Sequence, residues 1–197
     1  QYTVTTAFTP PELTGEDAYT IPAQGYLFYT VPAGRAAYRV TGTESPMLYT
    51  FDFTSEALVY SGGVYWLYNG GSPKYLRIFN LTDAEKVGTL LTEPRQTLTR
   101  DETADIESGL LHYVGFTPDI TAYYRIETTS DAVTAGLLEP EDTTGQGYWL
   151  HAGQTYYARL TGTENIDTQV RFVLSATDIA YGQTAVTGDP ERGSSVR

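Results

Sequence analysis

The chain has 197 residues, of which 41% are hydrophobic and 13% aromatic, and it carries a formal net charge of −12. This apolar content is ample for a packed core and excludes a disordered chain, while the acidic balance opposes binding to nucleic acid phosphates or to an anionic membrane. Cysteine is absent, which excludes disulfides, thiolate catalysis and cysteine-ligated metals.

The first predicted element is a strand at residues 2–8, which Pro10 and Pro11 terminate. Alternation places one set of side chains on a single face of this strand: Tyr2, Val4, Thr6 and Phe8. An open sheet edge can be completed by a strand from another chain, so we consider this strand a candidate for donation to a second copy. The alternative is a conventional first strand that pairs within its own domain.

Short predicted strands follow at regular spacing, separated by turns rich in glycine, proline and asparagine. In chain order they cover residues 26–31, 36–41, 47–53, 58–60, 64–68, 75–79 and 87–92, and the plan returns over residues 110–175. Helical patterns are nearly absent. The sequence therefore predicts an all-β protein built from sandwiches or barrels.

Three motifs occur twice in the same order, 82 to 86 residues apart. They are Tyr38-Arg39-Val40 with Tyr124-Arg125-Ile126, Tyr65-Trp66-Leu67 with Tyr148-Trp149-Leu150, and Arg77-Ile78 with Arg159-Leu160. A repeat of this size indicates a duplicated unit that could fold by itself.

We therefore divide the chain into an N-terminal extension (1–13), two repeats (14–92 and 109–176), an acidic linker (93–108) and a polar tail (177–197). The repeats should superpose strand for strand. Trp66 and Trp149 lie beside valine or leucine, so we expect both in equivalent core positions, in preference to a sugar-stacking platform.

Residues 25–34 (GYLFYTVPAG) and 37–42 (AYRVTG) consist of a strand ending in a Val-Pro-Ala-Gly turn and a second strand ending in Thr-Gly. This resembles the opening of bacterial pre-peptidase C-terminal (PPC) domains. Residues 63–67 (GVYWL) and 147–150 (GYWL) lie where that family has a Gly-x-Tyr strand, and residues 130–133 (SDAV) resemble its aspartate-rich strand, whereas residues 46–49 (PMLY) lack the aspartate. The resemblance implies tandem jelly-roll-like antiparallel β-sandwiches on a secreted protein, often a non-catalytic accessory that binds substrate or aids export.

The sequence contains few candidate catalytic or metal-binding residues. Oxygen-bearing side chains alternate at Asp101, Thr103, Asp105 and Glu107, as in calcium loops, but the glycine that sharpens such a loop is missing, so we expect a solvated linker. His112 and His151 have no neighbours at metal-ligand spacing, and no serine lies in a Gly-x-Ser-x-Gly elbow. We expect no enzymatic activity and no cofactor, with calcium as the one candidate ion.

A further candidate is the sequon Asn80-Leu81-Thr82, which lies on a predicted turn and matters only where the source glycosylates asparagine.

The composition suits a protein outside the cytoplasm. No apolar run approaches the ~20 residues needed to span a bilayer, and the start at Gln1 is consistent with signal-peptide removal. We expect a secreted structural subunit that polymerises with copies of itself into an extracellular filament, surface layer or viral fibre. The alternative is an accessory module of a secreted hydrolase or adhesin that binds polysaccharide or protein.

Overall fold

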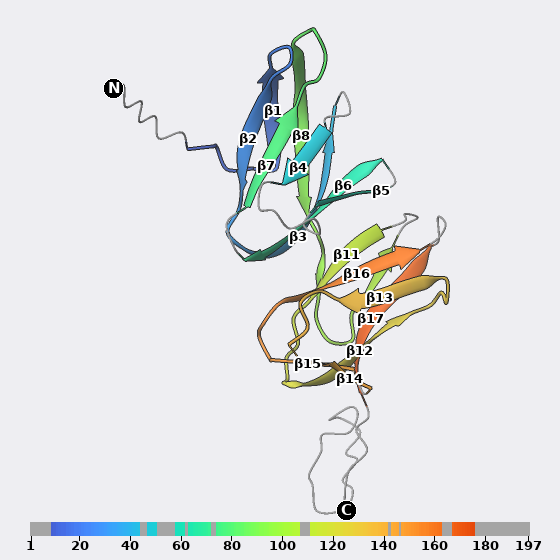
Figure 1. The fold of residues 1–197 in the computed structure, drawn as a ribbon. Coiled ribbons are helices and arrows are strands. Elements are labelled where there is room, and N and C mark those ends of the chain that lie inside the picture. Colours follow the sequence, from blue (N-terminus) through green and yellow to red (C-terminus); the bar gives the residue numbers. More distant parts are fainter. Residues whose placement is uncertain are drawn as a thin grey trace, which may run out of the picture. The chain divides into compact units, whose positions relative to one another are not determined.

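The computed structural model describes residues 9–43, 47–50, 58–61, 63–71, 74–106, 111–141, 143–145, 147–162 and 167–175 (Figure 1). The prediction of an all-β protein is confirmed, because these residues form 17 strands and no helix. Within the described ranges there is accordingly no helix able to cross a membrane. The chain divides into two compact units, Gln1–Pro94 (unit 1) and Arg95–Arg197 (unit 2).

Unit 1 contains two sheets. The five-stranded sheet has the order β1-β8-β3-β6-β5 and the three-stranded sheet the order β2-β7-β4. The strands are β1 (Glu16–Ile21), β2 (Tyr26–Val31), β3 (Gly34–Gly42), β4 (Met47–Thr50), β5 (Leu58–Ser61), β6 (Val64–Gly71), β7 (Lys74–Phe79) and β8 (Lys86–Pro94).

Unit 2 repeats this plan with one additional short strand. Its sheets have the orders β10-β17-β12-β15-β14 and β13-β16-β11-β9. The strands are β9 (Thr97–Leu98), β10 (Thr103–Ile106), β11 (Leu111–Phe116), β12 (Ala122–Thr128), β13 (Val133–Leu137), β14 (Thr143–Thr144), β15 (Gly147–Leu150), β16 (Tyr156–Gly162) and β17 (Thr168–Leu174).

The two units match in strand order, and the β2–β7 pair matches the β11–β16 pair in register. Phe28 on β2 lies opposite Arg77 on β7, and Tyr113 on β11 lies opposite Arg159 on β16. The short strand β9 also has a counterpart, since β9 runs parallel to β11 and Glu12 forms a parallel bridge with Thr30 on β2. The internal repeat thus extends to the pairing of the strands.

Residues 93–108, expected to form an acidic linker, instead carry β9 and β10. Strand β10 pairs with β17, and its alternate residues Ala104 and Ile106 are buried in the core of unit 2. Residues 103–106 are therefore a strand with Thr103 and Asp105 facing outward, because apolar residues occupy every second position. Unit 2 begins at Arg95, earlier than the expected start of the second repeat.

The core of each unit draws side chains from both of its sheets. In unit 1, Leu67 on β6 joins Ile78 on β7, and in unit 2, Leu150 on β15 joins Leu160 on β16. The leucine of the repeated Tyr-Trp-Leu motif faces the core, so the preceding tryptophan faces the opposite side of the sheet. Trp66 is buried as expected, at 3% exposed, whereas Trp149 is half-buried, so the expectation of equivalent core positions is wrong for Trp149; neither ring belongs to a core cluster.

Candidate functional site

An aromatic surface with a central arginine covers the outer face of the β2-β7-β4 sheet. Alternation along β2 and β7 turns Leu27, Tyr29, Leu76 and Ile78 toward the core. The residues between them face outward, and we call this set the arginine face: Tyr26, Phe28, Tyr75, Arg77 and Phe79.

The arginine face is held together by ring contacts. The Arg77 guanidinium lies 3.9 Å from the ring centroid of Phe79 and 6.0 Å from that of Tyr26, within the range of cation–π attraction. The Tyr26 ring packs edge-on against Phe28 at 5.4 Å between centroids. Tyr26 and Tyr75 remain 55% and 39% exposed, so the face presents tyrosine and a cation to a partner.

The counterpart of the arginine face in unit 2 is buried at three of its five positions. These are Leu111, Tyr113 and Tyr157, with exposures of 3%, 1% and 6%, whereas Arg159 and Thr161, which match Arg77 and Phe79, are half-buried. None of the three belongs to the core cluster of unit 2. The duplicated surface is thus open in unit 1 and covered in unit 2.

A second aromatic cluster lies on the outer face of the five-stranded sheet of unit 2. Trp149 on β15 lies directly opposite Tyr123 on β12, with their rings edge-on and 4.9 Å apart, and the ring of His151 lies 6.4 Å from that of Trp149. His151 Nε2 is 3.2 Å from Glu141 Oε2, and both side chains are nearly half exposed. We call Tyr123, Trp149, His151 and Glu141 the tryptophan face.

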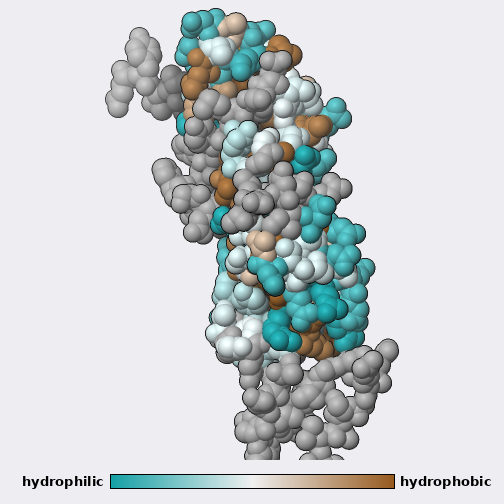
Figure 2. Space-filling model, turned by 90° about the vertical axis from the view of Figure 1, so that its right-hand side faces the viewer, coloured by the Kyte–Doolittle hydropathy of each residue, from teal (hydrophilic) through white to brown (hydrophobic). Residues whose placement is uncertain are grey.

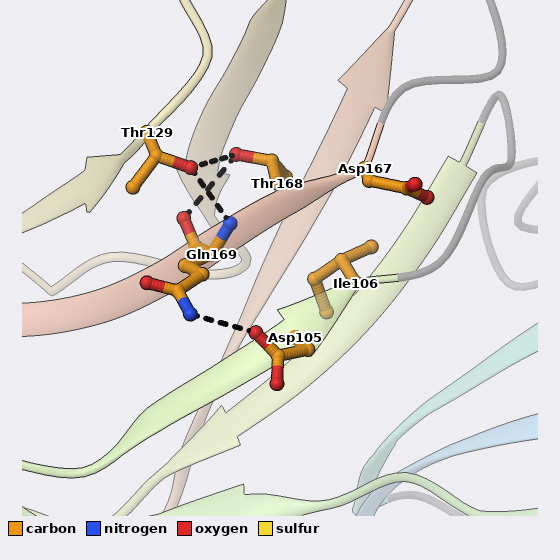
Figure 3. A pocket seen from close by; sticks show the side chains of 6 residues that line it. All are labelled: Asp105, Ile106, Thr129, Asp167, Thr168 and Gln169. Carbon is orange, nitrogen blue, oxygen red and sulfur yellow. Dashed lines mark hydrogen bonds between the residues drawn. The ribbon is translucent and has the colours of Figure 1, made fainter.

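An open cavity of about 310 Å³ lies beside β10 and β17 in unit 2 (Figure 3). Gln169 Nε2 donates to Asp105 Oδ1 at 2.8 Å, and the backbone N–H of Gln169 donates to Thr129 Oγ1 at 2.9 Å. The remaining lining residues are Ile106, Asp167 and Thr168. The lining offers carboxylates, hydroxyls and an amide, with no histidine, lysine or cysteine among them, and Asp105, Thr129 and Gln169 hydrogen-bond to one another.

The candidate calcium residues do not gather around one point. Asp101 has a positive φ of 70° and lies next to Arg100, whose Nε is 3.8 Å from Asp101 Oδ2. Thr103 and Asp105 project outward from the extended strand β10, and Glu107 lies outside the described residues. Among the described residues there is no group of three acidic or histidine side chains that could hold a metal ion.

The two histidines have separate environments. His112 is half-buried on β11 and lies opposite Leu160, on the face that carries Val114 and Phe116 into the core. It corresponds to Leu27 of unit 1, whose partner is Ile78. His151 belongs to the tryptophan face, and the structure does not bring the two histidines into one site.

Asn80, the first residue of the sequon, is 1% exposed and fixes a turn. Its Nδ2 donates to the carbonyl oxygens of Ile21, Pro22 and Ala84, and its Oδ1 accepts from the N–H and the hydroxyl of Thr82. The amide nitrogen that would carry a glycan is thus buried and fully engaged, so Asn80 acts as a structural residue in the folded chain.

The predicted assembly strand lies outside the described residues, and so does the polar tail. The segment that follows the strand is attached to its own unit: the N–H of Thr30 donates to Pro11 O at 2.7 Å, and the Thr30 hydroxyl donates to Pro10 O at 3.2 Å. Pro10 and Pro11, which terminate the predicted strand, are therefore anchored along β2.

Three ionisable groups among the described residues have displaced pKa values, and burial raises the pKa of one of them, Tyr29 in the core of unit 1. Burial raises the pKa of Tyr124 to about 12, with a further contribution from the charge of Asp119. The backbone N–H of Thr99 donates to Glu102 Oε2 at 2.6 Å and lowers the pKa of that carboxyl. Tyr124 and Glu102 are also structural: Tyr124 lies in the core of unit 2, and Glu102 closes the turn before β10.

The sequence carries a signal for the arginine face that the expectations above did not include. The alternating pattern of β2 and β7 places two apolar sets on opposite faces, and only one of them can face the core. A strand that is apolar on both sides is buried on both sides or marks an interaction surface.

Comparison with models of protein families, with curated proteins and with solved structures finds no match for this chain.

Proposed function

We propose that this protein is a secreted, non-enzymatic structural subunit that polymerises with copies of itself into an extracellular filament, surface layer or viral fibre. The observation that carries the proposal is the arginine face of unit 1, where Tyr26 and Tyr75 lie exposed. Among the described residues, the exposed large hydrophobic side chains are Tyr26, Tyr60, Tyr75, Leu81, Val87 and Leu91. All lie in unit 1. In the view of Figure 2, brown apolar residues reach the surface at several places along the described part of the chain. Apolar surface of this kind is typical of a protein–protein contact.

In this proposal each unit is a PPC-like, jelly-roll-like β-sandwich. The mixed origin of the core clusters supports it, since buried residues of both sheets contact one another in each unit. The identical strand order of the two units further supports a tandem pair derived by duplication.

The chemistry of the described surface is consistent with a non-catalytic role. The polar groups around Asp105 bond to one another, and the lining of that cavity offers carboxylates, hydroxyls and an amide without a histidine, lysine or cysteine. The proposal needs no cofactor and no nucleic acid, and its partner is a second copy of the chain.

Strand donation by residues 2–8 is one route to assembly. A donated strand would add a ladder of main-chain hydrogen bonds and place Val4 and Phe8 in the core of the acceptor. The parallel pairing of residues 11–13 with β2 supports the presence of a nearby edge along which such a strand could run.

Size measurement on the purified chain, combined with electron microscopy, tests the function, and deletion of residues 1–9 tests the route. Strand donation predicts that the truncated chain stays folded but no longer polymerises. If the truncated chain polymerises like the full chain, the strand is not the connector.

A binding module for polysaccharide is the second candidate, and the tryptophan face favours it. A half-exposed tryptophan with a neighbouring tyrosine, a carboxylate and an imidazole offers both a stacking surface and hydrogen-bond partners for sugar hydroxyls. Calorimetric titration with oligosaccharides tests this candidate, with Trp149→Ala as the variant that should lose binding and Tyr60→Ala as the control.

A further inference from the structure

The two units cover opposite faces of equivalent sheets. In unit 2 the outer face of the sheet that contains β11 and β16 is buried at Leu111, Tyr113 and Tyr157, whereas the equivalent arginine face of unit 1 exposes Tyr26 and Tyr75. The same type of surface is therefore covered in one unit and open in the other.

The five-stranded sheets have the reverse relation. In unit 1 the outer face is buried at Ala37, Trp66 and Tyr68, with exposures of 1%, 3% and 8%, although none of them belongs to the core cluster. In unit 2 the equivalent tryptophan, Trp149, is half-buried, and its neighbours His151 and Glu141 are exposed.

Each unit therefore leaves a different sheet face open: the arginine face in unit 1 and the tryptophan face in unit 2. We propose that the arginine face of unit 1 binds the tryptophan face of unit 2 in a second copy of the chain. This inference rests on the proposed function and specifies the surfaces through which the subunit assembles.

The chemistry of the two faces is complementary. The arginine face presents the guanidinium of Arg77 among aromatic rings, and the tryptophan face presents the Trp149 ring beside the Glu141 carboxylate. A guanidinium binds favourably over an indole ring and beside a carboxylate, and tryptophan, tyrosine and arginine are the residues that dominate protein interfaces.

The two faces differ from each other and lie on different units. A contact between two different surfaces of identical subunits is heterologous: it leaves one face of each kind open at the ends of any assembly, and it grows as an open chain unless the rotation closes a ring. The proposal thus predicts polarity, with an arginine face at one end of the polymer and a tryptophan face at the other.

The test blocks one face at a time in the full chain. Tyr26→Glu places a charge in the arginine face, Trp149→Ala removes the ring from the tryptophan face, and Tyr60→Glu is the control, because Tyr60 is 62% exposed on β5 and belongs to neither face. Circular dichroism establishes that each variant is folded, and sedimentation velocity measures its size.

The expected result is that each face variant alone is monomeric where the wild type and Tyr60→Glu polymerise, with the apparent dissociation constant raised about 30-fold or more, as for an interface hot spot. An equimolar mixture of the two face variants should form dimers and nothing larger, because each supplies the face that the other lacks.

Three outcomes would overturn the inference. In the first, both face variants polymerise as readily as the wild type and deletion of residues 1–9 gives monomers. Assembly would then depend on the strand, and the proposed function would stand. Dimers of the Trp149→Ala variant alone would indicate contact between two arginine faces. A monomeric wild type whose Trp149 binds oligosaccharide would remove both the inference and the proposed function.

Discussion

At the scale of single residues, Asn80 shows how much of a turn can depend on one side chain. Its amide makes hydrogen bonds to three carbonyl groups and accepts two more from Thr82, which ties the β1–β2 turn to the turn after β7. An amide supplies donors and an acceptor in one planar group, and no other side chain of this size does so.

We predict that Asn80→Ala lowers the free energy of unfolding by about 3 kcal/mol, because buried carbonyl groups lose their donors. Asn80→Asp keeps the size but faces those carbonyls with a carboxylate, so it should be at least as destabilising. Urea denaturation measures both, and Leu81→Ala serves as the control because Leu81 is 60% exposed. Stability of Asn80→Ala equal to that of the wild type would contradict the structural role.

The raised pKa of Tyr124 predicts how the free energy of unfolding changes at alkaline pH. Its pKa is raised from 10.0 to about 12 in the folded chain, so the folded state holds the neutral form more strongly than the unfolded state does. This contribution to stability is fully present below pH 10 and is lost as the pH rises toward 12. Over that window the loss amounts to at most about 1.4 kcal/mol per pH unit.

Tyr124→Phe isolates this effect from the other tyrosines. The variant loses the hydrogen bond to Ile120 O, which should cost about 1 kcal/mol near neutral pH. Its free energy of unfolding should then fall less steeply than that of the wild type above pH 10. Parallel profiles for the two proteins would mean that Tyr124 titrates normally.

At the scale of strands, the alternation of residues predicted most of the described elements but not all of their roles. The predicted strands at 26–31, 36–41, 64–68 and 75–79 correspond to β2, β3, β6 and β7. Strand β10 was missed because its outward residues, Thr103 and Asp105, lie in an acidic stretch typical of a solvated linker. Only the burial of Ala104 and Ile106 distinguishes the two possibilities, and burial depends on partners distant in the sequence.

The face on which each tryptophan lies could not be derived from alternation alone. Both faces of β6 and β15 carry large apolar residues, so the pattern separates the two sets without assigning either to the core. The register also shifts between the units, because Trp66 lies opposite Arg39 whereas Trp149 lies opposite Tyr123.

The two tryptophans should therefore respond differently to truncation. We predict that Trp66→Ala costs about 3–5 kcal/mol, in the range of buried aromatic residues, and that the half-buried Trp149→Ala costs about 1 kcal/mol. Chemical denaturation of the two variants side by side provides the measurement. Equal losses would argue that the outer faces of the two sheets have the same environment.

The extended geometry of strand β10 also predicts how calcium affects the melting temperature. Side chains two positions apart on an extended strand are separated by roughly 6–7 Å, so Thr103 and Asp105 do not converge on one ion, and Asp105 already accepts from Gln169. We predict that millimolar calcium and a chelator give the same melting temperature, since a ligand that does not bind the folded state cannot stabilise it. A rise in melting temperature with calcium would restore the metal site.

At the scale of the whole molecule, the internal repeat explains why a single chain exposes sheet faces that other copies could bind. Duplication of a unit duplicates every outer face, but the chain covers Tyr113 and Trp66 and leaves their counterparts Phe28 and Trp149 more accessible. An assembly of copies would cover the remaining faces. The sequence predicts the duplication from its repeated motifs, whereas the choice of covered faces appears only in the folded chain.

The most direct test of this account is the size of the purified full chain as its concentration is raised, measured by sedimentation velocity with electron microscopy of the same samples. We predict a shift from monomers to elongated polymers of uniform width, and a loss of that shift in Tyr26→Glu. A chain that remains monomeric at every concentration would contradict the account.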